Sequence, residues 1–74
     1  MKSDSKSWLL DIIRCIEKLD KPEFDLADMY AYERELSRLH PENKHVKDKI
    51  RQHLQILRDK GHLDFVGRGK YKVI

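Results

Sequence analysis

Hydrophobic residues recur at helical spacing in three stretches of the chain and at strand spacing near residue 70. In residues 8–19 the apolar positions fall on one stripe when the chain is turned about 100° per residue, and Trp8 lies near its centre. Ser5 or Ser7 can cap this stretch, and Pro22 ends it because proline disfavours helix in the residue before it. The pattern predicts a first helix over about 7–19 with Trp8 in the core.

A second helical stretch follows a short extended segment at residues 23–26. Asp25 suits the N-cap position, and Pro41 forces a break after the helix. The pattern predicts a helix from about Leu26 to Leu39. Its apolar face consists of Met29, Tyr32, Leu36 and Leu39, with Leu26 and Tyr30 at the edge.

The third helical stretch is predicted from Asn43, a favourable N-cap, to Gly61, a favourable C-terminal stop. His53 falls on its apolar side. Beyond Gly61 the apolar residues alternate with polar ones, which is strand periodicity, and Gly67-Arg68-Gly69 supplies a tight turn. The apolar stripe of the helix is Val46, Ile50, Leu54 and Leu57, and the alternating pairs are Leu63/Phe65 and Tyr71/Val73.

The predicted order is therefore helix, short strand, helix, helix, strand, turn, strand. An α+β, mostly helical chain of three helices plus a small β-hairpin wing is typical of a winged helix-turn-helix. The chain has 74 residues, enough for one modest core. We expect residues 1–6 to form a flexible N-terminal leader and residues 7–74 to form one winged-helix DNA-binding domain.

Charge is distributed unevenly along the chain. Residues 1–40 carry 7 Lys/Arg and 9 Asp/Glu, a balance of −2, whereas residues 41–74 carry 9 and 4, a balance of +5. The two sum to the net charge of +3. An excess of cations on the third helix and the hairpin together indicates a surface that meets a polyanion.

The outer face of the third helix carries side chains with paired hydrogen-bond donors and acceptors, which is what reading base edges in the DNA major groove requires. Gln55 and Arg58 lie nearer its rim, and an ordinary solvated helix face fits the same pattern equally well. In the wing, Arg68, Gly69 and Lys70 are expected to contact phosphates or the minor groove. Base or near-base contacts are expected from Asn43, Lys44, His45, Lys47, Asp48, Arg51 and Gln52.

Motifs for catalysis or metal binding are not found in the sequence. The single cysteine, Cys15, excludes an internal disulfide and lies in an apolar stripe, where a buried thiol is expected. The four histidines lack metal-site spacing, and phosphate-cradling and nucleophile motifs are missing. We therefore expect no metal site, no cofactor and no enzymatic activity. The absence of a signal peptide and of a membrane span predicts a cytoplasmic protein.

Two segments of the chain carry a family resemblance: NKHVKDKIRQHLQILRDKG with a hairpin ending GRGKY, and SWLLDIIRCIEKLDKPEFDLADMYAYERELSRLHPENKH. They resemble the C-terminal winged-helix domain of the DpnI-type methyl-directed restriction endonucleases, also called Dam-replacing proteins. The resemblance runs from about Ser7 to Ile74 and departs from the family at His53, where the family has Gln.

The resemblance implies binding to double-stranded DNA at GATC sites with methylated adenines. It further implies that the domain is the recognition module of a restriction endonuclease, whose metal-dependent nuclease domain this chain lacks. The matching recognition-helix residues are Lys44 to Gln52, and the matching wing residues are Arg68 to Lys70. Two alternatives remain open: a transcriptional regulator without methyl preference, and a winged helix that binds a protein.

Preference for a methyl group requires an apolar or planar surface, because a methyl on the adenine amine crowds the usual pairing with Asn or Gln. The outer face of the third helix offers few such surfaces. The candidates for methyl contact are His45, Val46 and Trp8.

Overall fold

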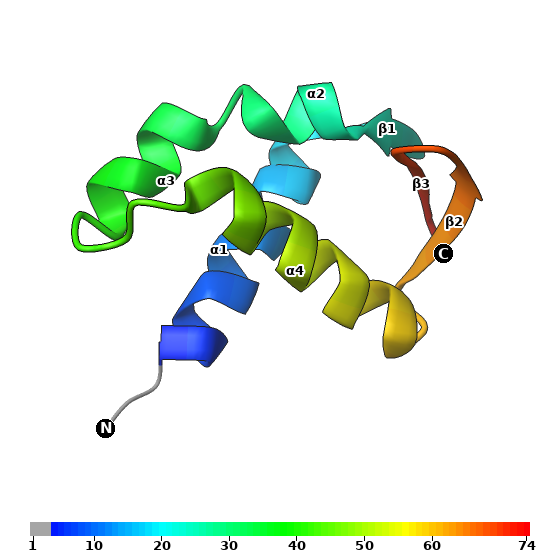
Figure 1. Cartoon of the computed structure of the whole chain (residues 1–74). Helices are drawn as coiled ribbons and strands as arrows, with labels where there is room; N and C mark the ends of the chain where they lie inside the picture. The colour runs from blue at the N-terminus through cyan, green and yellow to red at the C-terminus, as the bar shows by residue number, and fades with distance from the viewer. Residues whose placement is uncertain (1–3) are drawn as a thin grey trace.

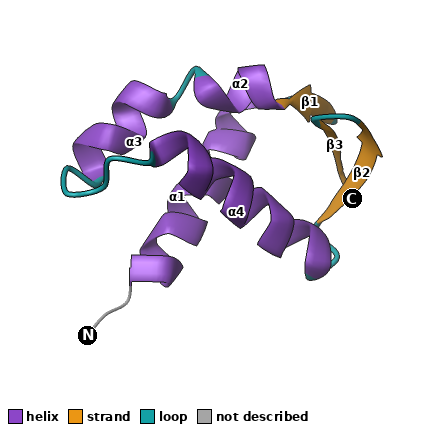
Figure 2. Cartoon of the chain, in the orientation of Figure 1, coloured by secondary structure: helices purple, strands orange, loops and turns teal. Residues whose placement is uncertain are grey.

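A computed structural model describes residues 4–74 of the chain (Figure 1). Helices occupy most of the described chain, and a small sheet lies at one end of them (Figure 2). This is the α+β, mostly helical winged helix-turn-helix that the sequence predicts. The elements are α1 (Asp4–Leu19), β1 (Glu23–Asp25), α2 (Leu26–Tyr30), α3 (Glu33–Leu39), α4 (Val46–Asp59), β2 (Leu63–Gly67) and β3 (Lys70–Val73).

The core forms where α1 and α4 pack against each other and against the elements around them. The predicted stripes of these two helices are confirmed, and His53 is buried with the α4 stripe, as predicted. Each large apolar side chain that leaves water contributes about 1.5–3 kcal/mol to folding. The buried apolar residues are Trp8, Ile12, Cys15, Phe24, Met29, Leu36, Val46, Ile50, Leu54, Leu57, Leu63 and Tyr71.

Helix α1 begins at Asp4, three residues before the predicted start at Ser7. Residues 4–6 are therefore part of α1, residues 1–3 lie outside the described part of the chain, and the flexible leader stays a prediction. Near this end, the Trp8 ring stacks on His40 with ring centres 4.0 Å apart and planes 14° apart. His40 Nε2 lies 2.7 Å from a carboxylate oxygen of Asp11. The stack joins the start of α1 to the residue that follows α3.

The predicted helix over Leu26 to Leu39 is divided into α2 and α3. A capping box starts α2: Asp25 Oδ1 accepts the N–H of Asp28 at 2.9 Å, and Asp28 Oδ2 accepts the N–H of Asp25 at 3.1 Å. Helix α2 then ends at a tight turn in which the N–H of Tyr32 donates to the carbonyl of Met29 at 2.9 Å. Leu39, the last residue of α3, is 55% exposed, contrary to the prediction, whereas Leu36 in the same helix is buried.

Helix α4 begins at Val46, so Asn43 is not its N-cap as predicted. The Asn43 side chain instead accepts the N–H of His45 at 2.7 Å, a bond that stabilises the turn before the helix. The predicted stop at Gly61 is confirmed. Gly61 has φ of 86°, and the amide of the next residue, His62, donates to Leu57 at 2.9 Å, as in a Schellman motif.

The predicted hairpin is confirmed as β2 and β3, joined by a turn at Arg68 and Gly69. The predicted short strand is confirmed as β1. It pairs with β3, which the sequence did not indicate, and gives an antiparallel strand order of β1-β3-β2. Tyr71 in the middle strand pairs with Phe24 on one side and Phe65 on the other. The two strands of the wing, β2 and β3, therefore belong to a three-stranded sheet in which β1 pairs with the other side of β3.

Candidate nucleic-acid interface

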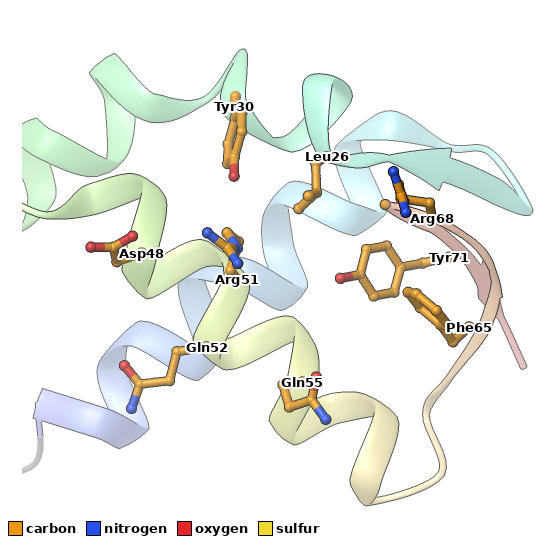
Figure 3. A pocket seen from close by; sticks show the side chains of 10 residues that line it. Leu26, Tyr30, Asp48, Arg51, Gln52, Gln55, Phe65, Arg68 and Tyr71 are labelled. Atoms are coloured by element: carbon orange, nitrogen blue, oxygen red, sulfur yellow. The ribbon is translucent and has the colours of Figure 1, made fainter.

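The outer face of α4 is polar because its apolar stripe is buried against α1 and the remaining core. Arg51 lies at the middle of this face, one turn from the carboxylate of Asp48 (Figure 3). Lys47, Asp48, Arg51, Gln52 and Gln55 are all exposed. The donor and acceptor groups that the sequence singles out therefore face solvent together on one side of the helix.

A groove of about 670 Å³ separates α4 from the wing (Figure 3). It brings together six of the predicted contact residues, four from α4 and two from the turn of the wing. In the chain, the two groups are separated by β2. The six residues are Asp48, Arg51, Gln52, Gln55, Arg68 and Gly69.

The floor of the groove is apolar, a feature that sequence reasoning missed. Tyr71 is 8% exposed and Phe65 is 49% exposed, and their rings meet edge to face with centres 5.8 Å apart. Leu26 and Tyr30 of α2 complete the floor. Strand alternation placed Phe65 and Tyr71 in a hairpin, but no local signal placed α2 beside them.

Two of the aromatic rings of this surface each have a cation nearby. The guanidinium of Arg58 lies 6.0 Å from the centre of the Phe65 ring, and the ammonium of Lys47 lies 5.2 Å from the centre of the Tyr30 ring. Burial raises the pKa of the Tyr71 hydroxyl above its ordinary value, although the charge of Arg51 opposes the shift. A tyrosine hydroxyl is already protonated at neutral pH at its ordinary pKa of 10.0, and the raised pKa keeps it so.

Several predicted contact residues lie outside the groove. Lys44 and His45 are exposed in the turn before α4, and Asn43 is half-buried there. Lys47 is exposed on the first turn of α4, and Lys70 is exposed at the start of β3. These residues do not line the groove.

The three residues predicted to contact a methyl group differ in exposure. Val46 is 5% exposed and Trp8 is 3% exposed, so both are part of the core. Val46 is the first residue of the apolar stripe of α4, and Trp8 is covered by His40. Their burial argues against a contact with a base, whereas His45 remains exposed.

Within residues 4–74, no group of three or more His, Cys, Asp or Glu side chains is arranged to hold a metal ion. None of the helices described there has the length and apolar character needed to cross a membrane.

The fold and the groove define the class of protein. A helix-turn-helix whose last helix exposes hydrogen-bond donors and acceptors beside a cationic two-stranded wing is a winged helix-turn-helix of the kind that binds DNA. The chain belongs to the Dam-replacing HTH domain family, whose sequence pattern matches residues 4–73. Membership of this helix-turn-helix family indicates double-stranded DNA as the partner.

Proposed function

We propose that this domain binds duplex DNA with α4 in the major groove, and that it reads adenine-methylated GATC sites as the recognition module of a restriction endonuclease. The observation that carries the DNA contact is the groove between α4 and the wing. It combines the paired donors and acceptors of Arg51, Gln52 and Gln55 with the cation of Arg68.

The proposed docking follows from the chemistry of the two partners. The major groove of DNA admits an α-helix, and an arginine pairs with guanine through two hydrogen bonds. Arg51, at the middle of the exposed face, is the proposed guanine reader. Arg68 and Lys70 in the wing contact backbone phosphates, which fix the position of α4 without reading the sequence.

The apolar floor supports the proposed preference for methylated adenine. Phe65 exposes half of its surface at the edge of the groove, beside Tyr71 and close to the polar face of α4 (Figure 3). It supplies the surface that the outer face of α4 lacks. One buried methyl group contributes about 0.8 kcal/mol, which is about fourfold in affinity, and two give about 15-fold if additive.

The restriction role rests on the resemblance to methyl-directed restriction endonucleases. In this proposal, cleavage belongs to a nuclease domain of the parent protein, and the domain described here selects the site. A cytoplasmic location is part of the same proposal.

Fluorescence anisotropy tests both parts of this function. The domain is titrated with fully methylated, hemimethylated and unmethylated GATC duplexes, and with a scrambled duplex, over a series of salt concentrations. We expect the affinity to decrease in that order and to fall as salt rises, because phosphate contacts release counterions.

Equal affinity for the methylated and unmethylated duplexes would leave an ordinary DNA-binding regulator. An affinity that does not change with salt would argue against the proposed phosphate contacts. Reversal of charge at Arg51 and Lys47 without loss of DNA affinity would favour a winged helix that binds a protein.

A further inference from the structure

Two polar side chains outside the groove are almost buried. Asp11 of α1 and His40, the residue that follows α3, have 12% and 14% of their side chains exposed, and neither of them lines the groove. His40 Nε2 lies 2.7 Å from the carboxylate of Asp11. Polar groups lose free energy when they leave water unless a hydrogen bond compensates them. The proposed contacts with DNA use neither residue, so the pair needs another explanation.

The ring of His40 is held by α1 at its edge and on its face. An ionised carboxylate only accepts hydrogen bonds, so Nε2 of His40 is the donor to Asp11. The face of the ring stacks on the buried Trp8 ring. The Trp8 ring is in turn stacked with that of His53 in α4, with ring centres 6.0 Å apart and planes 23° apart. The position of His40 is therefore set by two residues of the first helix.

Hydrogen bonds continue from His40 through the turn to α4. The carbonyl of His40 accepts the N–H of Asn43 at 3.0 Å, and the side chain of Asn43 accepts the N–H of His45 at 2.7 Å. The carbonyl of His45 accepts the N–H of Lys49 at 3.0 Å, in the first turn of α4. Together with the bond between Asp11 and His40, these contacts form an unbroken series from α1 to the start of α4.

The start of α4 depends on this turn more than most helix starts do. Its N-cap residue, His45, makes no side-chain capping bond within residues 4–74, although such a bond commonly fixes the first turn of a helix. Figure 1 shows that the turn after α3 runs directly into α4. The first turn of α4 exposes Lys47 and Asp48. In a helix-turn-helix, the N-terminal residues of the recognition helix contact the base edges.

We propose that Asp11 and His40 are positioning residues, which fix the start of α4 for base reading without touching the DNA themselves. The proposal rests on the proposed DNA binding. Hydrogen bonds to base edges require aligned donors and acceptors, so a start of α4 that shifts weakens them. Phosphate contacts carry no sequence information and depend on the number of cations, which stays the same. The series of bonds from Asp11 therefore supports specificity.

The first test removes the acceptor. Anisotropy titrations over a salt series compare the affinity for the methylated GATC duplex with that for the scrambled duplex. We expect Asp11→Ala to lower the ratio of the two affinities by a factor of about 2 to 30, the range for residues that act without touching the ligand. The slope against salt should match that of Glu17→Ala, which removes an exposed carboxylate from the same helix and should keep the wild-type ratio.

Two further variants separate the bond from the packing. Asp11→Asn keeps an oxygen that can accept from His40 and should keep most of the wild-type ratio. His40→Phe keeps an aromatic ring against Trp8 but removes the donor, so it should lower the ratio as Asp11→Ala does. The double variant should lose no more than either single one, because both remove the same bond. Thermal unfolding identifies a temperature at which every variant is folded, and the titrations are made there.

Hydrogen exchange followed by NMR tests the series of bonds directly, without DNA. In Asp11→Ala, the amides of Asn43, His45 and Lys49 should exchange about tenfold faster, which corresponds to the loss of one hydrogen bond. The amide of His62, which bonds to Leu57 at the other end of α4, is the internal control and should be unchanged. Equal acceleration at all four amides would mean a general loss of stability and would overturn the positioning role.

The outcomes separate the two proposals. Wild type that binds the GATC and scrambled duplexes equally overturns the proposed function, and the positioning role with it. Wild type that prefers the GATC duplex, while Asp11→Ala and His40→Phe keep the same ratio, overturns the positioning role alone. A ratio that falls equally in Glu17→Ala would make the effect one of charge and would also overturn it.

Discussion

The backbone amide of Leu26 donates a hydrogen bond to the carbonyl of Gly69, with 2.9 Å between the two atoms. The bond joins the first residue of α2 to the turn of the wing, two points that are far apart in the sequence. Both residues line the groove beside α4. The position of the wing over that groove therefore depends on α2 as well as on its own hairpin.

Gly69→Ala should destabilise the protein and weaken DNA binding. Gly69 has φ of 64°, and a residue with a Cβ in this left-handed region costs about 1–2 kcal/mol. We expect a similar loss in the free energy of unfolding, measured by urea denaturation. Gly67→Ala is the control, because its φ is not in that region and an added Cβ would meet nothing closer than 3.8 Å. Equal losses in the two variants would argue against strain at the turn.

Phe65→Ser should lower the preference for methylated DNA and also lower stability modestly, because the ring is 49% exposed and packs edge to face on Tyr71. The expected change is about fourfold in the affinity ratio for each methyl group that the ring no longer covers, measured by anisotropy with methylated and unmethylated duplexes. Val66→Ser is the matched control on the same strand, with 46% of its surface exposed and no place in the groove lining. An unchanged ratio in Phe65→Ser would place methyl reading elsewhere.

Cys15 should resist alkylation in the native protein. Burial raises the pKa of its thiol to about 11, so the reactive thiolate is scarce at neutral pH, and the side chain is 3% exposed. Iodoacetamide labelling followed by mass spectrometry should give slow reaction in buffer and rapid reaction in urea. Ser37→Cys in a Cys15→Ser background supplies an exposed control thiol on α3. Rapid labelling of both proteins in buffer would contradict the burial of Cys15.

The raised pKa of Cys15 also predicts how stability changes at high pH. The folded state holds the thiol proton more tightly than the unfolded state, whose thiol has a pKa of 9.0. The contribution of the protonated thiol to the stability of the folded state is therefore complete below pH 9.0 and is lost as the pH rises to about 11. A Cys15→Ala variant should lack that part of the alkaline decline in denaturation experiments.

Asp28→Asn should destabilise the protein at neutral pH and less so in acid. The N–H of Asp25, with help from Lys21, holds the pKa of the Asp28 carboxyl below its ordinary value of 3.8. The folded state thus favours the ionised form, and the contribution to stability is present above pH 3.8 and lost as pH falls through the folded pKa. Thermal unfolding from pH 7 to pH 2 should show the wild-type and variant curves converging in acid.

Asp59→Asn provides the same change of charge at a carboxylate outside the capping box. A constant difference between wild type and Asp28→Asn across the pH range would argue against a role for the ionised carboxylate in the box.

Local patterns predicted most of the elements and the core. The stripes of α1 and α4 depend on spacing within one helix, and the stop at Gly61 depends on the residue itself. The prediction of Asn43 as the N-cap was wrong because its side chain accepts the N–H of His45, two residues on, and so stabilises a turn before the helix. The division between α2 and α3 had no Gly or Pro to mark it.

The site was predictable only where it belongs to one element. The outer face of α4 and the turn of the wing each follow from local periodicity, and both are exposed as expected. The floor of the groove requires Leu26 to lie beside Gly69, a contact between residues 43 positions apart, since 69 − 26 = 43. The pairing of β1 with β3 is equally distant and involves only three residues per strand, too few for a periodic signal.

The strand order β1-β3-β2 also determines the order in which parts of the sheet can form. The middle strand is the last of the three to be synthesised, so β1 waits for residues 70–73 before it acquires a neighbour. Contacts between distant segments form slowly because a long loop must close first. The helices can form before β3 is available, and the groove is completed only after Gly69 and Tyr71 are in place. A nascent chain that stops short of β3 would present α4 without the surface beside it.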